Sequence, residues 1–119
     1  MVDSSSVTKS HVDVSVVIGF RDWGIRRIRL AVESIQRSFG RFNGEVIISD
    51  YGSIDPKANE ALAEELGCPY VHTPAEVWSR SRALNAGFAI SNGQLLVSTD
   101  ADMVFTPRAF EKIVETAIA

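Results

Sequence analysis

Short continuous runs of apolar residues alternate along the chain with longer stretches in which apolar residues recur every three or four positions. The continuous runs are residues 14–18 (VSVVI), 45–49 (EVIIS), 69–72 (PYVH) and 95–99 (LLVST). Runs bounded by polar or turn-forming residues are typical of strands covered on both faces, as in a parallel sheet. The pattern therefore predicts four buried strands.

The clearest helical pattern lies in residues 23–39. Apolar side chains spaced by three and four positions form one face of this segment, namely Ile25, Ile28, Val32, Ile35 and Phe39. Gly40 is expected to end the helix, because glycine readily adopts the left-handed conformation common just after a helix.

A second helix is predicted over residues 56–66. Asp55 followed by Pro56 is a typical helix start, with an acid at the N-cap and proline at the first helical position. The inward face of this helix is expected to hold Ala58, Leu62 and Leu66. Gly67 should end it.

Residues 82–90 give a third helix with Leu84 and Phe88 toward the sheet, and a last helix begins at Thr106 and Pro107. Strands that alternate with helices require right-handed crossovers and a parallel sheet, which defines an α/β fold. The loops at residues 19–23, 50–53 and 100–102 then meet at one edge of the sheet, where ligands of such folds bind.

Composition indicates one compact domain, since 45% of the 119 residues are hydrophobic and 23% are charged. The net charge is −3, and no dense block of Lys and Arg suggests a nucleic-acid partner. Cys68 has no partner for an internal disulfide, which fits a reducing cytoplasmic setting. No apolar run is long enough to span a membrane, and residues 1–13 are expected to be a disordered leader before a domain at 14–119.

Candidate chemistry gathers at the predicted edge. Asp100 and Asp102 are separated only by Ala101, so in an extended segment both carboxylates point the same way and suit a divalent cation. Gly19 would let the backbone approach a ligand, and Asp50 would hydrogen-bond a base or hydroxyl. Arg80 or Arg82 would neutralise phosphate oxygens. Each residue alone also fits an ordinary turn or a solvated charge, but a nucleoside diphosphate needs all four features together.

In order and spacing these blocks resemble the family 2 glycosyltransferases, which are inverting enzymes of the GT-A fold that use nucleotide-diphosphate sugars. The segments that carry the resemblance are VSVVI, EVIISDYGSID and RALNAGFAISNGQLLVSTDAD, within residues 14–119. The resemblance implies a three-layer sandwich whose mainly parallel sheet has the strand order 3-2-1-4, in truncated form. It also implies hexosyl transfer from a nucleotide sugar, with a UDP-sugar favoured, to the hydroxyl of a carbohydrate or other acceptor.

The resemblance also implies roles for single residues. Asp102 would ligate Mn²⁺ or Mg²⁺, and Asp100 would lie near the ribose or the metal. Asp50 would belong to the turn that binds the base. The nucleoside pocket would be lined by Gly19, Phe20 and Arg21.

This chain departs from the family's pattern at two positions. Gly19 stands where the family usually has proline, and Tyr51 stands where it usually has a second acid. Tyr51 would either stack on or hydrogen-bond a base, or pack half-buried on the loop. Uridine specificity rests less firmly on this turn as a result.

In the resembled family the catalytic base comes from a later segment, so this chain alone is expected to be inactive. Its exposed sheet edge would favour a homodimer, and any membrane association would come from a part of the enzyme that this chain does not contain. Two alternatives are a nucleotide-binding fragment without turnover and a receiver domain of the phosphorelay type. A receiver needs an acid pair directly after the first strand, where only Asp22 is present.

Overall fold

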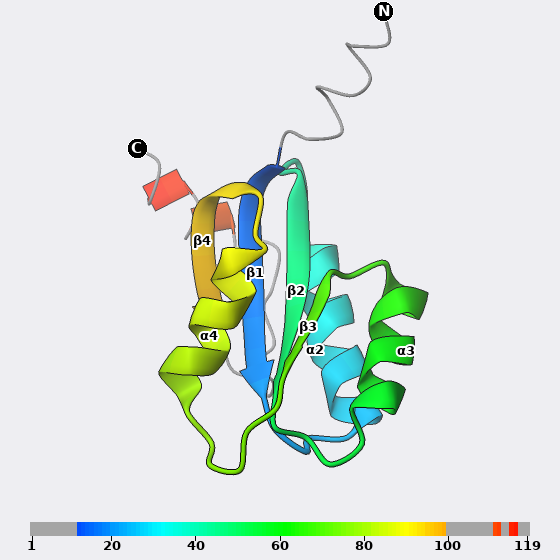
Figure 1. Cartoon of the computed structure of the whole chain (residues 1–119). Helices are drawn as coiled ribbons and strands as arrows, with labels where there is room; N and C mark the ends of the chain where they lie inside the picture. Colours follow the sequence, from blue (N-terminus) through cyan, green and yellow to red (C-terminus); the bar gives the residue numbers. More distant parts are fainter. Residues whose placement is uncertain (1–11, 100–110, 113–114, 117–119) are drawn as a thin grey trace, which may run out of the picture.

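The computed structural model describes residues 12–99, 111–112 and 115–116. Its elements follow one another as β1 (Val12–Phe20), α2 (Ile25–Ser38), β2 (Gly44–Tyr51), α3 (Pro56–Leu66), β3 (Tyr70–Thr73), α4 (Arg80–Ala89) and β4 (Gly93–Thr99). The strands form one sheet in the order β3-β2-β1-β4, and every neighbouring pair is parallel (Figure 1). The predicted α/β fold and strand order are confirmed.

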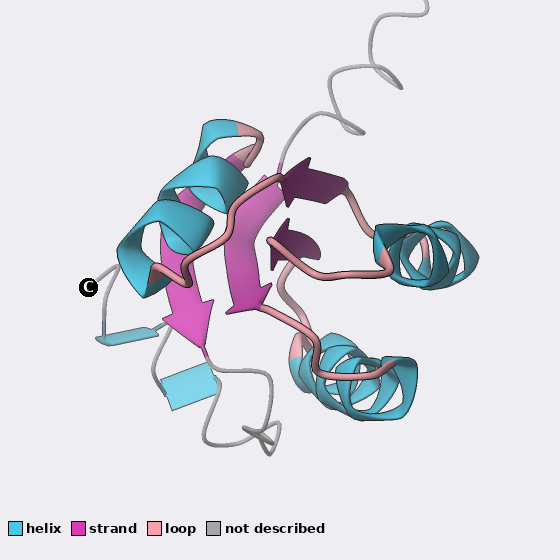
Figure 2. Cartoon of the chain, turned by 60° about the horizontal axis from the view of Figure 1, so that its bottom comes forward, coloured by secondary structure: helices cyan, strands magenta, loops and turns pink. Residues whose placement is uncertain are grey.

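The sheet lies between two layers of helices. Helices α2 and α3 cover one face and α4 covers the other (Figure 2). Because side chains alternate along a strand, Val16 and Ile18 pack into the larger core on the α2 and α3 side, while Val17 packs with Leu84 on the α4 side. Cys68 belongs to the larger core, where burial raises the pKa of its thiol to about 11. This placement is that of a structural thiol.

Most element boundaries differ from the prediction by one or two residues, and three of these differences matter for the sheet or the site. Strand β1 begins at Val12, so Val12 and Asp13 belong to the sheet and not to the expected leader. Strand β2 runs through Tyr51, which places Asp50 in the strand and not in the following turn. Helix α4 begins at Arg80 because the Ser79 hydroxyl accepts a hydrogen bond from the Arg82 amide at 3.3 Å and caps the helix two residues early.

Two helical positions face the opposite way from the prediction. Ile25 is 45% exposed, because it is the first residue of α2 and lies beyond the edge of the sheet. On α3, Ala58 is exposed and Asn59 is buried in its place. Asn59 turns inward because its side-chain amide finds a hydrogen-bond partner there.

A polar cluster joins three strands at the edge where they begin. The Glu45 carboxylate accepts hydrogen bonds from the Ser15 hydroxyl at 2.6 Å and from the Asn92 amide at 2.7 Å. The Gly93 amide donates to the same Ser15 hydroxyl at 2.8 Å. A side chain at Gly93 would meet the Ser15 amide nitrogen at 2.6 Å, so only glycine fits at the start of β4.

Several predicted features lie outside the described residues. They are the leader up to residue 11, the acids Asp100 and Asp102, and most of the last helix, of which 111–112 and 115–116 are described as helical. In the described part of the chain, no helix is long and apolar enough to cross a membrane.

Candidate functional site

The carboxyl ends of β1 and β2 lie side by side at one edge of the sheet, which faces forward in Figure 2. Phe20 pairs with Asp50 in the register of the two strands. The loops that follow are hydrogen-bonded to each other, since the Asp22 amide donates to the Ser53 hydroxyl at 2.9 Å and the Ile54 amide donates to the Asp22 carboxylate at 2.8 Å. The structure therefore brings together the first two loops that the sequence placed at this edge.

The fourth strand reaches the same edge on the other side of β1. Thr99, the last residue of β4, pairs with Ile18 near the end of β1. The two predicted metal ligands follow directly in the sequence, at positions outside the described residues.

Asp50 is fully buried and its carboxylate accepts three hydrogen bonds. One oxygen accepts from the Ser53 amide at 3.1 Å. The other accepts from the Asn59 side-chain amide at 2.8 Å and from the Tyr70 hydroxyl at 2.9 Å. Burial and the hydrogen bond to Asp50 raise the pKa of Tyr70 well above its usual range, so the hydroxyl remains a donor.

This network assigns Asp50 a structural part in holding the turn after β2. Three donors satisfy most of what a carboxylate needs when it is removed from water. Sequence analysis missed both Asn59 and Tyr70 as its partners. Direct contact between Asp50 and a nucleoside stays a prediction.

Tyr51 and Trp78 pack against each other on the α4 side of the edge. Their ring centroids are 6.0 Å apart and the planes meet at 79°, an edge-to-face contact. Tyr51 is only 5% exposed, which agrees with the packing alternative for this residue. Trp78, which the sequence analysis did not single out, is 40% exposed beside it.

The residues predicted to line the nucleoside pocket occupy three different settings. Gly19 lies against α4, where an added side chain would meet the Ala83 side chain at 3.1 Å. Phe20 is fully buried in the larger core. Arg21 donates to the Glu76 carbonyl oxygen at 2.8 Å and so ties the first loop to the loop before α4. Gly19 and Arg21 thus stay candidates at the edge, whereas the Phe20 side chain points into the core.

Arg80 and Arg82 are both exposed in the first turn of α4. The cap by Ser79 fixes where this turn starts and therefore where the two guanidinium groups emerge. Their predicted contact with phosphate oxygens requires a ligand near the start of α4, beside the ends of β1 and β2.

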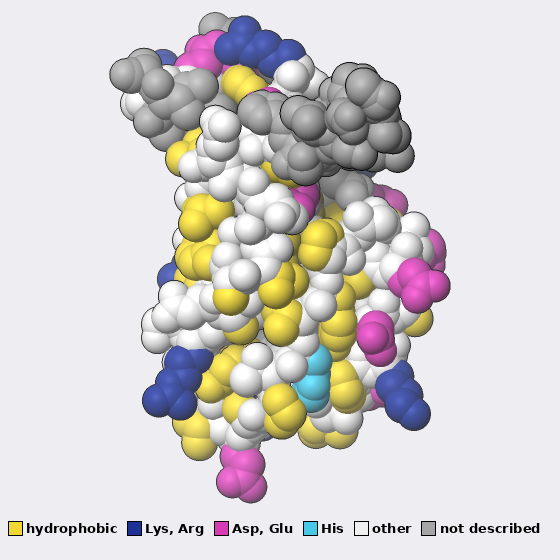
Figure 3. All heavy atoms as spheres, turned by 45° about the horizontal axis from the view of Figure 1, so that its top comes forward, with side chains coloured by type: hydrophobic (Ala, Val, Ile, Leu, Met, Phe, Trp, Pro, Cys, Tyr) yellow, Lys and Arg dark blue, Asp and Glu magenta, His cyan; other side chains and the backbone are white. Residues whose placement is uncertain are grey.

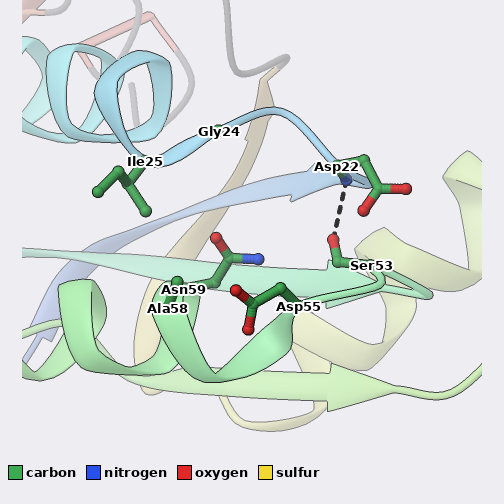
Figure 4. Close-up of a pocket in the computed structure, with 7 residues that line it drawn as sticks. All are labelled: Asp22, Gly24, Ile25, Ser53, Asp55, Ala58 and Asn59. Atoms are coloured by element: carbon green, nitrogen blue, oxygen red, sulfur yellow. Dashed lines mark hydrogen bonds between the residues drawn. The ribbon is translucent and has the colours of Figure 1, made fainter.

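A pocket of about 360 Å³ opens between the starts of α2 and α3 (Figure 4). It is lined by Asp22, Gly24, Ile25, Ser53, Asp55, Ala58 and Asn59. Asp55 occupies the predicted N-cap position of α3, but its side chain makes no capping hydrogen bond, contrary to expectation. The pocket contains none of the residues predicted to bind the nucleotide or the metal.

A metal site cannot be assembled from the described residues alone. Residues 12–99, 111–112 and 115–116 contain no group of three His, Cys, Asp or Glu side chains placed to hold an ion. The predicted Asp-x-Asp site therefore depends on positions beyond Thr99.

Comparison with known proteins decides the family. Residues 15–119 match the family described as glycosyl transferase family 2. The chain belongs to this family. The predicted resemblance is confirmed, and the receiver-domain alternative is wrong.

One relative of this family 2 glycosyltransferase chain is the undecaprenyl-phosphate 4-deoxy-4-formamido-L-arabinose transferase of Pseudomonas paraeruginosa (strain DSM 24068 / PA7). The two sequences are 34% identical over 99 residues, which is 78% of this chain and 27% of the relative. The chain thus spans about a quarter of the length of the relative it matches.

The strand-end edge of this glycosyltransferase chain concentrates positive charge. All three helices that the structure describes begin there, and none carries an acid in its first turn. Those turns instead hold Arg26, Arg27, Lys57, Arg80 and Arg82. Acids normally stabilise helix N-termini, where the dipole is positive, so this arrangement runs against helix stability. Positive side chains added to positive dipole ends favour an anionic ligand.

Proposed function

We propose that this chain is the donor-binding part of a glycosyltransferase and that it binds a nucleotide-diphosphate sugar, with a UDP-sugar favoured, at the carboxyl edge of its sheet. The observation that carries the proposal is that the helices begin with basic residues at the carboxyl edge of the sheet. Strand β4 ends at the same edge, and the Asp-x-Asp sequence follows it directly in the chain. A diphosphate is the anionic part of such a donor, and Arg80 and Arg82 are the side chains proposed to pair with it. The family match supports the same function.

The proposed metal is Mn²⁺ or Mg²⁺ on Asp100 and Asp102. Carboxylate oxygens are the hard ligands that both ions prefer, so the donor set suits them. When bound, the ion would offset negative charge on the leaving nucleoside diphosphate. The chain's own residues would position the donor, with Gly19, Arg21 and Tyr51 near the nucleoside.

For the acceptor, a polyprenyl phosphate is a stronger proposal than the hydroxyl first expected. The relative is named for undecaprenyl phosphate, which is an anionic lipid. A phosphate monoester has a second pKa of about 6, so its oxygen is already deprotonated at neutral pH. Attack by that oxygen needs no general base, whereas a hydroxyl acceptor would need one.

Donor binding is tested by calorimetry with UDP in the presence and absence of Mn²⁺. Asp102→Asn should lower the metal-dependent affinity by roughly tenfold or more, because one formal charge leaves the site. Asp55→Asn is the matched control, since Asp55 is an exposed acid at the same edge with no proposed ligand role, and its affinity should stay within about twofold. Equal binding with and without Mn²⁺ would contradict the metal site.

We expect the 119-residue chain alone to catalyse negligible inverting sugar transfer. The second candidate function is therefore that of a fragment that binds the nucleotide without turnover. Orientation of donor and acceptor in one site supplies much of an enzyme's rate, and this chain spans only about a quarter of the length of the relative it matches. Multiple turnover with a panel of UDP-sugars and undecaprenyl phosphate would overturn this expectation. Light scattering on the same samples tests the predicted homodimer, for which the candidate edge is the side of β4 away from β1, where no other described strand pairs.

A further inference from the structure

Exposed apolar side chains gather at the edge where the donor is proposed to bind. Ile54 is 87% exposed, Val77 is 77% exposed and Trp78 is 40% exposed. Ile54 lies in the loop after β2, and the other two lie in the loop between β3 and α4. We refer to Ile54, Val77 and Trp78 as the apolar rim.

The two loops that carry the apolar rim are bonded to each other. The Gly52 amide donates to the Thr73 carbonyl oxygen at 2.8 Å, and an added side chain at Gly52 would meet the Ala75 carbonyl oxygen at 2.6 Å. Tyr51 packs on Trp78 from the same strand end. Cross-bonding of this kind fixes the loop backbones and leaves the rim side chains facing outward.

The first loop is fastened to both of them. Asp22 accepts from the Ile54 amide at 2.8 Å, and Arg21 donates to the Glu76 carbonyl oxygen at 2.8 Å. Ile54 and Val77 therefore project from one connected group of loops, which lies at the lower end of the molecule in Figure 1.

A polar donor does not account for these side chains. The phosphates and hydroxyls of a nucleotide sugar are bound by hydrogen bonds and cations, whereas the exposed Ile54 and Val77 side chains offer only aliphatic surface that water hydrates unfavourably. Exposed apolar residues grouped together on one surface are a common sign of an interaction site.

The charge beside the apolar rim indicates the partner. Basic side chains lie in the first turns of α2 and α4 at the same edge, namely Arg26, Arg27, Arg80 and Arg82. Aliphatic residues with an exposed tryptophan and flanking arginines are typical of a surface that enters the headgroup layer of an anionic membrane. Among the residues that the structure describes in these loops, the acids Asp22, Asp55 and Glu76 are fewer than these cations together with Arg21 and Lys57. Asp100 and Asp102, which follow β4, are proposed to hold the metal ion.

A second apolar surface lacks this complementarity. On the face covered by α4, hydrophobic side chains gather over the middle and charged side chains lie mostly at the margins (Figure 3). That face includes Leu96 of β4, which is 45% exposed.

We propose that the apolar rim is the surface by which this chain docks onto an anionic lipid bilayer. Docking would turn the donor edge toward the headgroup layer, where a polyprenyl phosphate acceptor would present its phosphate. The biological purpose of this docking rests on the proposed function. Lipid binding itself can be measured without any donor present.

The fluorescence of Trp78 can report contact of the apolar rim with lipid. The chain has two tryptophans, so Trp23→Phe leaves Trp78 alone. Adding vesicles of phosphatidylglycerol and phosphatidylcholine should shift its fluorescence to the blue, and brominated lipid should quench it, because the ring enters an apolar layer. Vesicles of phosphatidylcholine alone should give a much smaller response, and added salt should weaken binding.

Two substitutions locate the contact. Ile54→Ser with Val77→Ser should lower partitioning onto the anionic vesicles by roughly tenfold or more, since both apolar side chains are lost from the contact. Leu30→Ser is the matched control: Leu30 is 63% exposed on the outer face of α2, and its loss should change partitioning by less than about twofold. Thermal melts check that all variants remain folded.

The outcomes are distinguishable. No response to anionic vesicles, or equal losses in the rim and Leu30 variants, would overturn the proposal. So would a protein dimer that the rim variant dissociates, because the rim would then bind a second copy. UDP binding measured without vesicles should be unchanged in the rim variant, so failure of the donor site and failure of the docking surface give different results.

Discussion

The two faces of the sheet are packed in different ways. On the α2 and α3 side, large side chains such as Phe20, Ile28 and Ile35 fill a continuous core. On the α4 side, the buried cluster among the described residues consists of Val17, Ile47 and Leu84, with Phe88 partly buried against it. The first face has the composition of an ordinary stabilising core.

Helix α4 instead packs through small residues that allow a close approach to the sheet. A side chain at Gly87 would meet a Val17 methyl at 2.4 Å, and the Ser49 hydroxyl donates to the Ala83 carbonyl oxygen at 2.6 Å. Close packing leaves α4 little freedom to shift, so its first turn is held at one place beside the strand ends. We infer that the first face mainly supplies stability and the second mainly positions Arg80 and Arg82.

Ile35→Ala should give the largest loss of stability. Ile35 is fully buried, and removing a buried side chain of this size lowers the free energy of unfolding by about 2–5 kcal/mol. Urea unfolding measures the loss. At temperatures where the variant is still folded, its UDP affinity should match that of the parent chain. A clear loss of affinity would contradict the inference that this face supplies stability and does not position the binding residues.

Gly87→Ala should affect both stability and binding. The new methyl group collides with Val17, and overpacking of this kind costs about 1–3 kcal/mol, more than the gain in helix propensity. Displacing α4 should also weaken UDP binding through Arg80 and Arg82.

Val17→Ala in the same chain provides the control for Gly87→Ala. It removes the methyl groups that collide, so the double variant should recover part of the lost UDP affinity. Additive losses in the double-mutant cycle would show that the effect does not come from this contact.

Asp50→Asn tests whether the buried carboxylate has only a structural part. Replacing one acceptor oxygen of Asp50 by an amide places a donor opposite other donors and should cost about 1–3 kcal/mol. Tyr70→Phe should cost about 1 kcal/mol, because it removes a hydroxyl whose proton is shared between Asp50 and the Pro56 carbonyl oxygen. If Asp50 also contacts the nucleoside, its variant should lose UDP affinity while Tyr70→Phe keeps it. Equal affinities in calorimetry would leave Asp50 as a structural residue.

The smallest expected effect compares two helix starts. Ser79→Ala removes the capping bond of α4 and should cost about 1 kcal/mol. Asp55→Ala at the start of α3 removes no capping bond and should stay within about 0.5 kcal/mol. Urea unfolding of both variants gives the comparison, and a larger loss for Asp55→Ala would be unexpected.

Local patterns were sufficient to predict most of the elements. Pro56 and Gly67 mark the two ends of α3 correctly, because proline and glycine act through the backbone itself. The strand order came from the resemblance, since periodicity alone does not determine which strands are neighbours. The outward position of Ile25 was missed because a repeat of three and four does not show where the sheet ends.

The partners of Asp50 could not have been found in the same way. Asn59 and Tyr70 lie 9 and 20 residues further along the chain, and they meet Asp50 only once α3 and β3 have packed. The burial of Phe20 could have been predicted from the sequence. Side chains alternate along a strand, so Phe20 lies on the same inward face as Val14, Val16 and Ile18. The basic residues of the three first turns can also be read from the sequence. The parallel sheet, however, is what brings the starts of these helices to the same edge.

The glycine at the start of β4 limits how the site can change. Gly93 and the Glu45 cluster fix the beginning of this strand at the edge opposite the proposed site. Adding one residue between Gly93 and Thr99 would advance the end of β4 by about 3.3 Å and also turn its last side chain to the other face of the sheet. Insertions of two residues, about 6.6 Å, would keep the face. During evolution the length of β4 before the two acids can therefore change only by two residues at a time, unless a bulge absorbs a single extra residue.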